Sequence, residues 1–140
     1  MQLDKVQPKN KRQLKQLINY AFKHNIYDLN FIDTSEITDM SLLFSNCMHN
    51  FDVSSWDVSN VTNMGYMFYH CKNFNCDLSN WDVSKVKNMN YMFYNCKNFN
   101  CNLSDWDISN MTRWKNIFCG CDKITIPNWY KKLYIVKNKI

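Results

Sequence analysis

Seven cysteines carry the most readily named chemistry in this 140-residue sequence. Six of them recur in two columns at a nearly constant interval, and the seventh stands apart. In a stack of repeats, neighbouring copies lie roughly 4.8 Å apart, a separation that a disulfide bond can bridge. The odd number argues against a complete disulfide framework, so we interpret these residues as small buried hydrophobic side chains. Disulfide or metal chemistry stays open as the alternative. The columns are Cys47, Cys71, Cys96 and Cys121 in the first and Cys76 and Cys101 in the second, with Cys119 outside both.

Four aspartates form another column, each placed two positions before a serine. A ladder of carboxylates could collect hard cations such as calcium. We favour a structural interpretation, because Asp-x-Ser is typical of turns in which the carboxylate accepts hydrogen bonds from nearby N–H groups. Catalysis by paired carboxylates requires two different environments, which four equivalent positions do not offer. The sequence therefore predicts a protein that is not an enzyme and that holds no cofactor or metal. The column consists of Asp33, Asp57, Asp82 and Asp107.

The candidate binding residues are those that the packing pattern leaves outside. The inward-pointing residues of this stretch are Met64, Met67, Phe68 and Cys71. The residues between them, Tyr66, Tyr69 and His70, should therefore point outward, and the same holds one repeat later. Tyrosine is enriched in interface cores because it offers a large amphipathic surface. The open alternative is that these rings pack over neighbouring repeats. A second candidate surface is the polar face of the predicted strands. The candidates are Tyr66, Tyr69, Tyr91 and Tyr94 on the first surface and Asp52, Asp77 and Asn102 on the second.

A repeated sequence must position all of these side chains. Its clearest copy, at positions 80–99, reads NWDVSKVKNMNYMFYNCKNF, and similar sequences occupy positions 55–74 and 105–124. A fixed period of this length indicates stacked repeats that bury their apolar faces against one another. Apolar and polar residues alternate around Cys76, which predicts a short strand, and the i, i+3, i+4, i+7 spacing from Met89 predicts a short helix. We expect the core columns to be Trp56, Trp81 and Trp106; Met64 and Met89; Phe68 and Phe93; and Cys71, Cys96 and Cys121.

An asparagine column accompanies the predicted strands, at Asn50, Asn75 and Asn100. Asparagine side chains form hydrogen bonds with nearby backbone groups. We therefore expect an amide ladder in which each side chain satisfies a backbone group of the next repeat.

Charge divides the chain into three parts. Residues 1–25 carry six Lys or Arg and one Asp, residues 26–112 carry four against ten acidic residues, and residues 113–140 carry seven against one. Phosphate affinity comes from Lys and Arg, so the acidic repeats are not expected to bind nucleic acid. Charge complementarity instead favours a basic protein partner.

The predicted organisation is one repeat region between two caps. We expect an N-terminal cap at residues 1–28, including an amphipathic helix at about 11–24, because apolar residues there have helical spacing. The repeats should occupy residues 29–126, and a basic cap or tail should follow at residues 127–140. No apolar stretch approaches the length of a membrane span, and we expect a monomer.

The repeated motif resembles a known family. The pattern WDVSNVTNMxYMFYxCxxFNxDLSxW, which recurs from about residue 29 to residue 126, is similar to the BspA-like leucine-rich repeat proteins. The resemblance implies an α/β repeat fold, a short right-handed solenoid with one short strand and one short helix per repeat. It implies adhesion or protein–protein interaction, and a cell-surface location. The sequence itself shows no signal-peptide pattern, which leaves a cytoplasmic location open. The alternative function is a small-ligand, cation or redox-linked role for the Cys and Asp columns.

Overall fold

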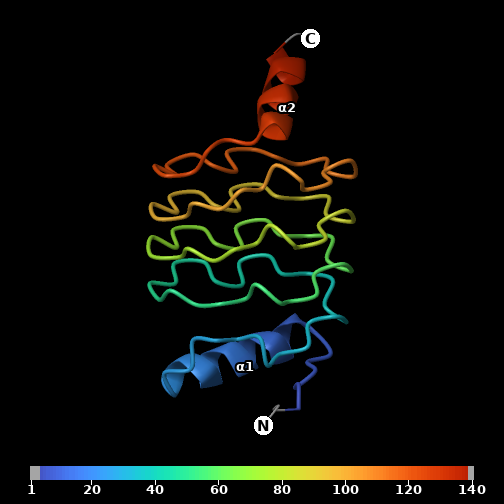
Figure 1. Cartoon of the computed structure of the whole chain (residues 1–140). Coiled ribbons are helices and arrows are strands. Elements are labelled where there is room, and N and C mark those ends of the chain that lie inside the picture. The colour runs from blue at the N-terminus through green and yellow to red at the C-terminus, as the bar shows by residue number, and fades with distance from the viewer. Residues whose placement is uncertain (1–3, 139–140) are drawn as a thin grey trace.

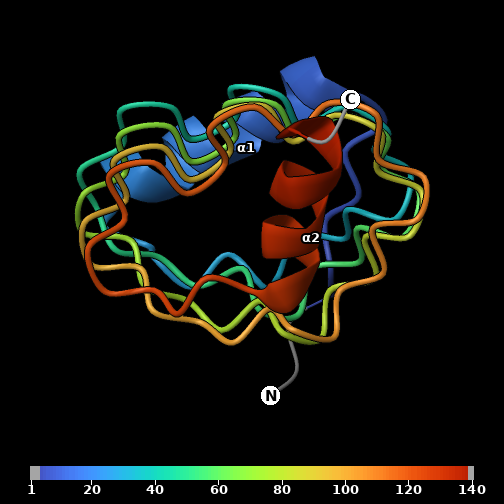
Figure 2. The same cartoon turned by 90° about the horizontal axis from the view of Figure 1, so that it is seen from above.

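The computed structural model describes residues 4–138, and its helices lie at the two ends: α1 at Lys11–Lys23 and α2 at Asn128–Asn138 (Figure 1). Between them the chain winds through flat coils that are stacked on one another and overlay closely when viewed along the stack (Figure 2). Isolated parallel bridges join the same point of successive coils, so one coil corresponds to one sequence repeat. These bridges link Asp39 to Asn63, Asn63 to Asn88 and Asn88 to Arg113.

The predicted α/β repeat class, a right-handed leucine-rich-repeat-like solenoid with one strand and one helix per repeat, is wrong for this structure. Within residues 4–138, the coils contain no helix and no pairing longer than an isolated bridge. Left-handed residues explain the missing helix, because a positive φ angle interrupts a right-handed helical turn. They recur at Tyr66 (φ 58°) and His70 (φ 59°) in one coil and at Tyr91 (φ 57°) and Asn95 (φ 58°) in the next.

Consecutive turns occupy the part of each coil where the helix was expected, and we call this part the turn segment. Within it, alternate N–H groups close turns inside the coil, as from Met67 to the carbonyl of Met64 at 3.2 Å. The other N–H groups form hydrogen bonds between coils. Those of Met64, Tyr66 and Phe68 each donate to a carbonyl of the next coil at 2.9 Å. Apolar residues are buried at the helical spacing, but bonds between coils replace the bonds within a helix. The turn segments cover residues 40–47, 64–71, 89–96 and 114–121.

The strand predicted around Cys76 is also absent, because side chains replace the backbone ladder there. The N–H of Asn75 donates to Oδ1 of Asn50 at 3.1 Å, and the N–H of Asn100 donates to Oδ1 of Asn75 at 3.1 Å. This is the amide ladder that the asparagine column predicts. The same contact repeats in register, so it fixes the stacking without a continuous strand.

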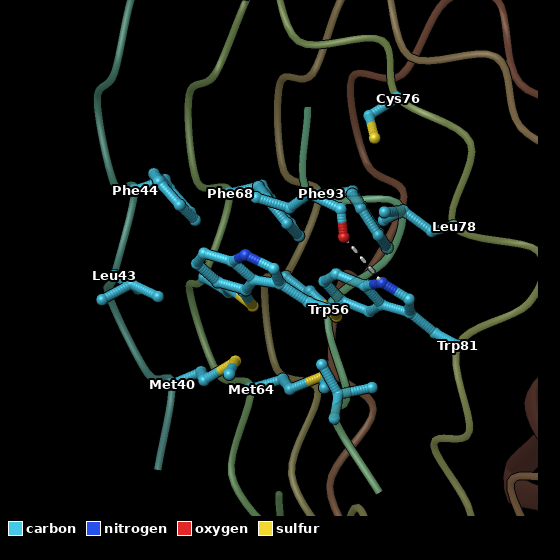
Figure 3. Close-up of a cluster of buried hydrophobic side chains, with 14 of the residues drawn as sticks. Met40, Leu43, Phe44, Trp56, Met64, Phe68, Cys76, Leu78, Trp81 and Phe93 are labelled. Atoms are coloured by element: carbon cyan, nitrogen blue, oxygen red, sulfur yellow. Dashed lines mark hydrogen bonds between the residues drawn. The ribbon is translucent and has the colours of Figure 1, made fainter. Parts of the chain in front are cut away.

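Aromatic columns fill the interior of the stack (Figure 3). The rings of Phe44 and Phe68 lie 5.7 Å apart with planes 3° from parallel, and those of Phe68 and Phe93 lie 5.4 Å apart at 7°. The indole of Trp81 donates from Nε1 to the carbonyl of Val53 at 3.1 Å, which satisfies its polar atom inside the core. All of the predicted core residues are buried except Cys121, which is half-buried. They are Trp56, Trp81, Trp106, Met64, Met89, Phe68, Phe93, Cys71 and Cys96.

The helix α1 covers the first coil and falls on the segment for which the sequence predicts an amphipathic helix. The side-chain oxygen of Asn10 accepts from the N–H of Gln13 at 3.0 Å and caps its N-terminus. Leu14, Ile18 and Ala21 are buried against the coil. The polar face stays outside, so the apolar end of the stack is closed on this side.

The helix α2 follows the last coil, where the sequence predicts only a basic cap or tail. Its first turn brings Trp129 into the tryptophan column: Nε1 donates to the carbonyl of Leu103 at 2.8 Å, and the ring stacks on Trp106 at 6.5 Å and 14°. The rest of the helix rises away from the stack (Figure 1). Neither of the helices in the described chain has the length and apolar character to cross a bilayer.

Candidate functional site

Four tyrosines gather on the outer side of two adjacent turn segments. Rings one coil apart are stacked: Tyr66 and Tyr91 lie 4.9 Å apart at 15°, and Tyr69 and Tyr94 lie 5.3 Å apart at 15°. Rings within a coil are tilted against each other, at 5.3 Å for Tyr66 and Tyr69 and 5.5 Å for Tyr91 and Tyr94. We call these four side chains the tyrosine patch. They pack over one another between coils, as the alternative interpretation expects, and still expose part of their surface.

Two members of the tyrosine patch adopt a backbone conformation that disfavours them. Tyr66 and Tyr91 have φ angles of 58° and 57°, in the left-handed region, where a bulky side chain costs roughly 1 kcal/mol or more. Each turn segment has a second left-handed position one turn later, and there the chain uses residues that tolerate it better: Asn46, His70, Asn95 and Gly120. The tyrosines are thus kept at a position where asparagine would fit the backbone better, as Asn116 does in the last coil.

Other side chains border the tyrosine patch. The imidazole of His70 lies 4.2 Å from the ring of Tyr69, and Nζ of Lys115 lies 5.9 Å from the centre of the ring of Tyr91. Leu42, which occupies the position of Tyr66 one coil earlier, is 55% exposed. The sequence pattern places His70 on the outward face, but the candidate binding residues did not include His70, Lys115 or Leu42. Aligning the repeats places Leu42 in the same column as Tyr66.

The second candidate surface is a groove along a different side of the stack. Asp52 and Asp77 line a groove of about 450 Å³ together with Asn50 and Asn75, and Cys76 contributes to its wall. A continuation of about 460 Å³ includes Asn102. No residue of the tyrosine patch lines either part, so the two candidate surfaces that the sequence suggests do not form one site.

The side-chain oxygens of Asp77 and Asn102 in this groove accept hydrogen bonds within local turns. Oδ1 of Asp77 accepts from the N–H of Ser79 at 3.0 Å and from its hydroxyl at 2.7 Å, and these bonds hold the pKa of Asp77 below its ordinary value. Asn102 makes the same turn with Ser104, at 3.0 and 2.7 Å. The turn therefore needs the side-chain oxygen and not the charge.

The other aspartate column makes the same turn. Oδ1 of Asp82 accepts from the N–H of Ser84 at 3.0 Å and from its hydroxyl at 2.6 Å, and these bonds lower the pKa of Asp82. The structural interpretation of the Asp-x-Ser pairs is confirmed by the equivalent bonds at Asp33, Asp57 and Asp107. Among residues 4–138, no three His, Cys, Asp or Glu side chains come together in a way that could hold a metal ion.

The first cysteine column forms hydrogen bonds between coils. Sγ of Cys71 donates to the carbonyl of Phe44 at 2.9 Å, and Sγ of Cys96 donates to the carbonyl of Phe68 at 2.9 Å. Burial raises the pKa of Cys71 to about 12 and raises the pKa of Cys96 as well. All seven cysteines are free thiols, and Cys119 alone is exposed. These properties make the column part of the core and leave it poorly suited to nucleophilic or redox chemistry.

The sequence matches a known protein family. The sequence matches the family described as "Mycoplasma protein of unknown function, DUF285" over residues 12–129. The match extends from α1 through the coils to the start of α2. No curated protein and no solved structure matches the chain.

Proposed function

This chain belongs to the Mycoplasma protein family of unknown function, DUF285, and we propose that it is a non-catalytic protein–protein interaction or adhesion module. The kind of function is that of the BspA-like surface proteins, which its repeated motif resembles. We assign the binding surface to the tyrosine patch. Its partner is a protein with a basic surface, because residues 26–112 as a whole carry ten acidic residues and four lysines.

The observation that carries this proposal is the left-handed backbone at Tyr66 and Tyr91. A bulky residue at such a position costs stability, and strained residues of this kind persist where the surrounding structure holds them and cluster at functional sites. The same backbone is built with Asn116 in the last coil, so the fold does not require tyrosine there. Interface hot spots are rich in tyrosine, which supports a binding role for side chains held at this cost.

The alternative, a cation, small-ligand or redox role for the Cys and Asp columns, has less support. The carboxylates accept bonds from the serines that follow them, and the buried thiols donate to carbonyl groups of the preceding coil. A ligand would have to break these bonds before it could use the same atoms. The groove beside Asp52 and Asp77 stays open to contacts with a partner surface.

A displayed random-peptide library, selected on the purified protein, tests the proposal with a defined probe. Selected peptides should bind the wild-type chain and lose about tenfold or more in affinity for a Tyr66→Asn/Tyr91→Asn variant, because hot-spot tyrosines contribute roughly 2 kcal/mol or more. A Tyr20→Asn variant is the matched control, since Tyr20 is exposed on α1 outside the patch. Equal binding by all three proteins would contradict the proposal.

A second pair of substitutions separates the two surfaces. Asp52→Asn/Asp77→Asn removes two charges and keeps the turn, because Asn102 makes the same turn naturally. Peptides that bind the tyrosine patch should tolerate this change. Loss of binding only in the aspartate variant would assign the interaction to the groove instead.

A further inference from the structure

We infer that the outer half of α2 is a peripheral membrane-binding element, which places its apolar side chains in the headgroup region of a bilayer that carries anionic lipids. We call its three exposed apolar residues, Tyr134, Ile135 and Val136, the apolar band. The inference rests on α2 alone and does not depend on the tyrosine patch or on the function proposed for it.

The two halves of α2 differ in what covers them. Trp129, Tyr130 and Leu133 pack against the core of the stack, and the indole of Trp129 is fixed by its hydrogen bond to the carbonyl of Leu103 at 2.8 Å. Beyond Leu133 the helix rises away from the last coil (Figure 1), and the three side chains of the apolar band are 63%, 51% and 61% exposed, respectively. The stack therefore holds the base of the helix and leaves the apolar band in solvent.

Exposed large hydrophobic side chains are consecutive in the apolar band and isolated elsewhere among residues 4–136. Single exposed hydrophobic residues are common on protein surfaces, whereas a contiguous group indicates contact with something other than water. The isolated ones are Val6, Tyr20, Ile26, Leu42, Met48 and Tyr66.

The arrangement of the apolar band around the helix indicates what kind of surface it contacts. Consecutive helical residues point about 100° apart, so Leu133 and the three residues of the band together point to all sides of the helix. The stack covers the side of Leu133. A partner helix would cover one of the remaining sides, whereas the headgroup region of a bilayer encloses a short helical segment on all of them.

Two exposed lysines, Lys131 and Lys132, lie directly beside the apolar band. The ion pairs of residues 4–138 use the ammonium groups of Lys9, Lys11 and Lys97, so no carboxylate neutralises either lysine of α2. Lysine side chains next to an apolar helical segment lay their methylene groups along it and extend their ammonium groups to anionic lipid headgroups. Tyrosine, which the band also contains, is enriched at this depth of a membrane.

The charge of the whole chain orients it on such a surface. Residues 26–112 carry ten acidic residues against four lysines, whereas residues 123–138 carry four lysines and no acidic residue. An anionic bilayer therefore attracts the end of the molecule that bears α2 and repels the coils. With 11 residues, α2 is about 16 Å long and does not cross the bilayer, so we expect reversible binding at its surface.

A second copy of the chain is a poorer occupant of this surface. Two α2 helices that packed through their apolar bands would bring the side chains of Lys131 and Lys132 from both copies close together, and like charges repel. An anionic bilayer supplies the opposite charge together with an apolar interior. We therefore assign the apolar band to a lipid surface.

Flotation of the purified protein with lipid vesicles tests the inference. The chain should float with phosphatidylcholine vesicles that contain about 30% phosphatidylserine, and vesicles of phosphatidylcholine alone should bind it at least about tenfold more weakly, because they lack the negative surface. Absence of binding to the anionic vesicles, or equal binding to both kinds, would overturn the inference.

Substitutions in the apolar band test the insertion. Ile135→Gln/Val136→Gln should lower the partition coefficient on anionic vesicles at least about tenfold, because less apolar surface enters the interface. Neither residue belongs to the core cluster, so the urea midpoint should not change. The matched control is Tyr20→Gln/Met48→Gln, which replaces two exposed hydrophobic residues outside α2 and should bind as the wild type does. Equal weakening by both variants would contradict the assignment to α2.

A second pair of variants tests the charges. Lys131→Gln/Lys132→Gln should bind anionic vesicles at least about tenfold more weakly, whereas Lys23→Gln/Lys72→Gln, which removes two exposed charges outside α2, should bind nearly as the wild type does. Equal weakening by both variants would mean non-specific charge attraction and would overturn the inference. Oligoglutamate serves as the probe for an acidic protein partner. If α2 binds this peptide and no anionic vesicles, the helix docks on an acidic protein and the membrane assignment is wrong.

Discussion

Two sets of stacked aromatic rings run along the same turn segments, one inside the coils and one outside. The inner phenylalanines Phe68 and Phe93 stack at 5.4 Å and 7°, and the outer tyrosines Tyr69 and Tyr94 stack at 5.3 Å and 15°. The phenylalanines are fully buried and the tyrosines are partly exposed. The repeat imposes parallel stacking on both sets, so stacking alone does not distinguish a structural ring from a binding ring.

The two sets differ in extent. The inner column continues through Phe44 and Phe118, so each coil contributes a ring. The outer pair has no such continuation: the positions equivalent to Tyr69 and Tyr94 are Ser45 and Cys119 in the flanking coils. The backbone is the same in all four, and the fold therefore specifies the inner residues but not the outer ones. The outer side chains, which differ from coil to coil, are therefore the ones available to bind a partner.

Alanine substitutions at two adjacent positions, made one at a time, should give the largest difference in stability between inner and outer rings. Phe93→Ala should lower the free energy of unfolding by about 3–5 kcal/mol. The substitution removes a buried ring, and the stacked rings on either side are held by their own coils and cannot move in to fill the cavity. Tyr94→Ala, its neighbour in sequence, should cost about 1 kcal/mol, since it loses one stacking contact at the surface. Urea denaturation of both variants measures the difference. Similar losses would show that the outer rings also hold the fold.

Thiol reactivity compares the inside and outside of the same coils. Burial raises the pKa of Cys71 to about 12, so its reactive thiolate is scarce near neutral pH. Cys119, at the outer position equivalent to Tyr94, is exposed. A thiol reagent at pH 8 should label Cys119 about a thousandfold faster than Cys71. Mass spectrometry of partly labelled protein gives the ratio, and comparable rates would contradict the closed core.

The pH dependence of stability should come from the outer turns and not from the phenylalanine column. Hydrogen bonds from Ser54 and Ser79 hold the pKa values of Asp52 and Asp77 below those of the unfolded chain. The folded state therefore favours the carboxylates, which stabilise it above about pH 4 and stop doing so as the pH falls through their lowered pKa values. Urea midpoints measured from neutral pH down to about pH 3 should fall. Phe93→Ala should show the same fall from a lower starting value, and a flat profile would contradict this assignment.

The smallest change in stability is expected for the residues with the proposed binding role. Tyr66→Asn/Tyr91→Asn relieves two left-handed tyrosines, a gain of about 1 kcal/mol each, and loses a stacked pair that contributes about 0.5–1.5 kcal/mol. The two effects oppose each other, so the unfolding free energy should stay within about 1 kcal/mol of the wild type. A loss as large as that of Phe93→Ala would place these tyrosines among the structural residues.

The sequence allowed prediction of the columns but not of the backbone between them. Burial of Trp81 and Phe93, the ladder at Asn75 and the turn at Asp82 all follow from residue type and period. The helix was wrongly predicted because a chain of consecutive tight turns buries side chains at the same i, i+3, i+4, i+7 spacing as a helix. The residues that exclude the helix are left-handed ones such as Tyr91, and tyrosine gives no local signal for that conformation.

The packing of the C-terminal segment on the last coil was also not predicted. Trp129 follows Trp106 by a shorter interval than the one that separates Trp81 from Trp106, so it is out of step with the repeat. It also lies in a basic segment that resembles a tail. Its place in the tryptophan column depends on α2 turning its first residues back over the last coil. Long-range packing of this kind leaves no periodic pattern in the sequence.

In this proposal the tyrosine patch binds a partner, and the phenylalanine column holds the fold together. Its most direct test is the dissociation constant of a library-selected peptide, measured on Tyr66→Asn/Tyr91→Asn under conditions where the variant unfolds at the same urea concentration as the wild type. The variant should bind the peptide at least about tenfold more weakly while its stability stays unchanged. Unchanged affinity, or affinity lost only together with stability, would contradict the proposal.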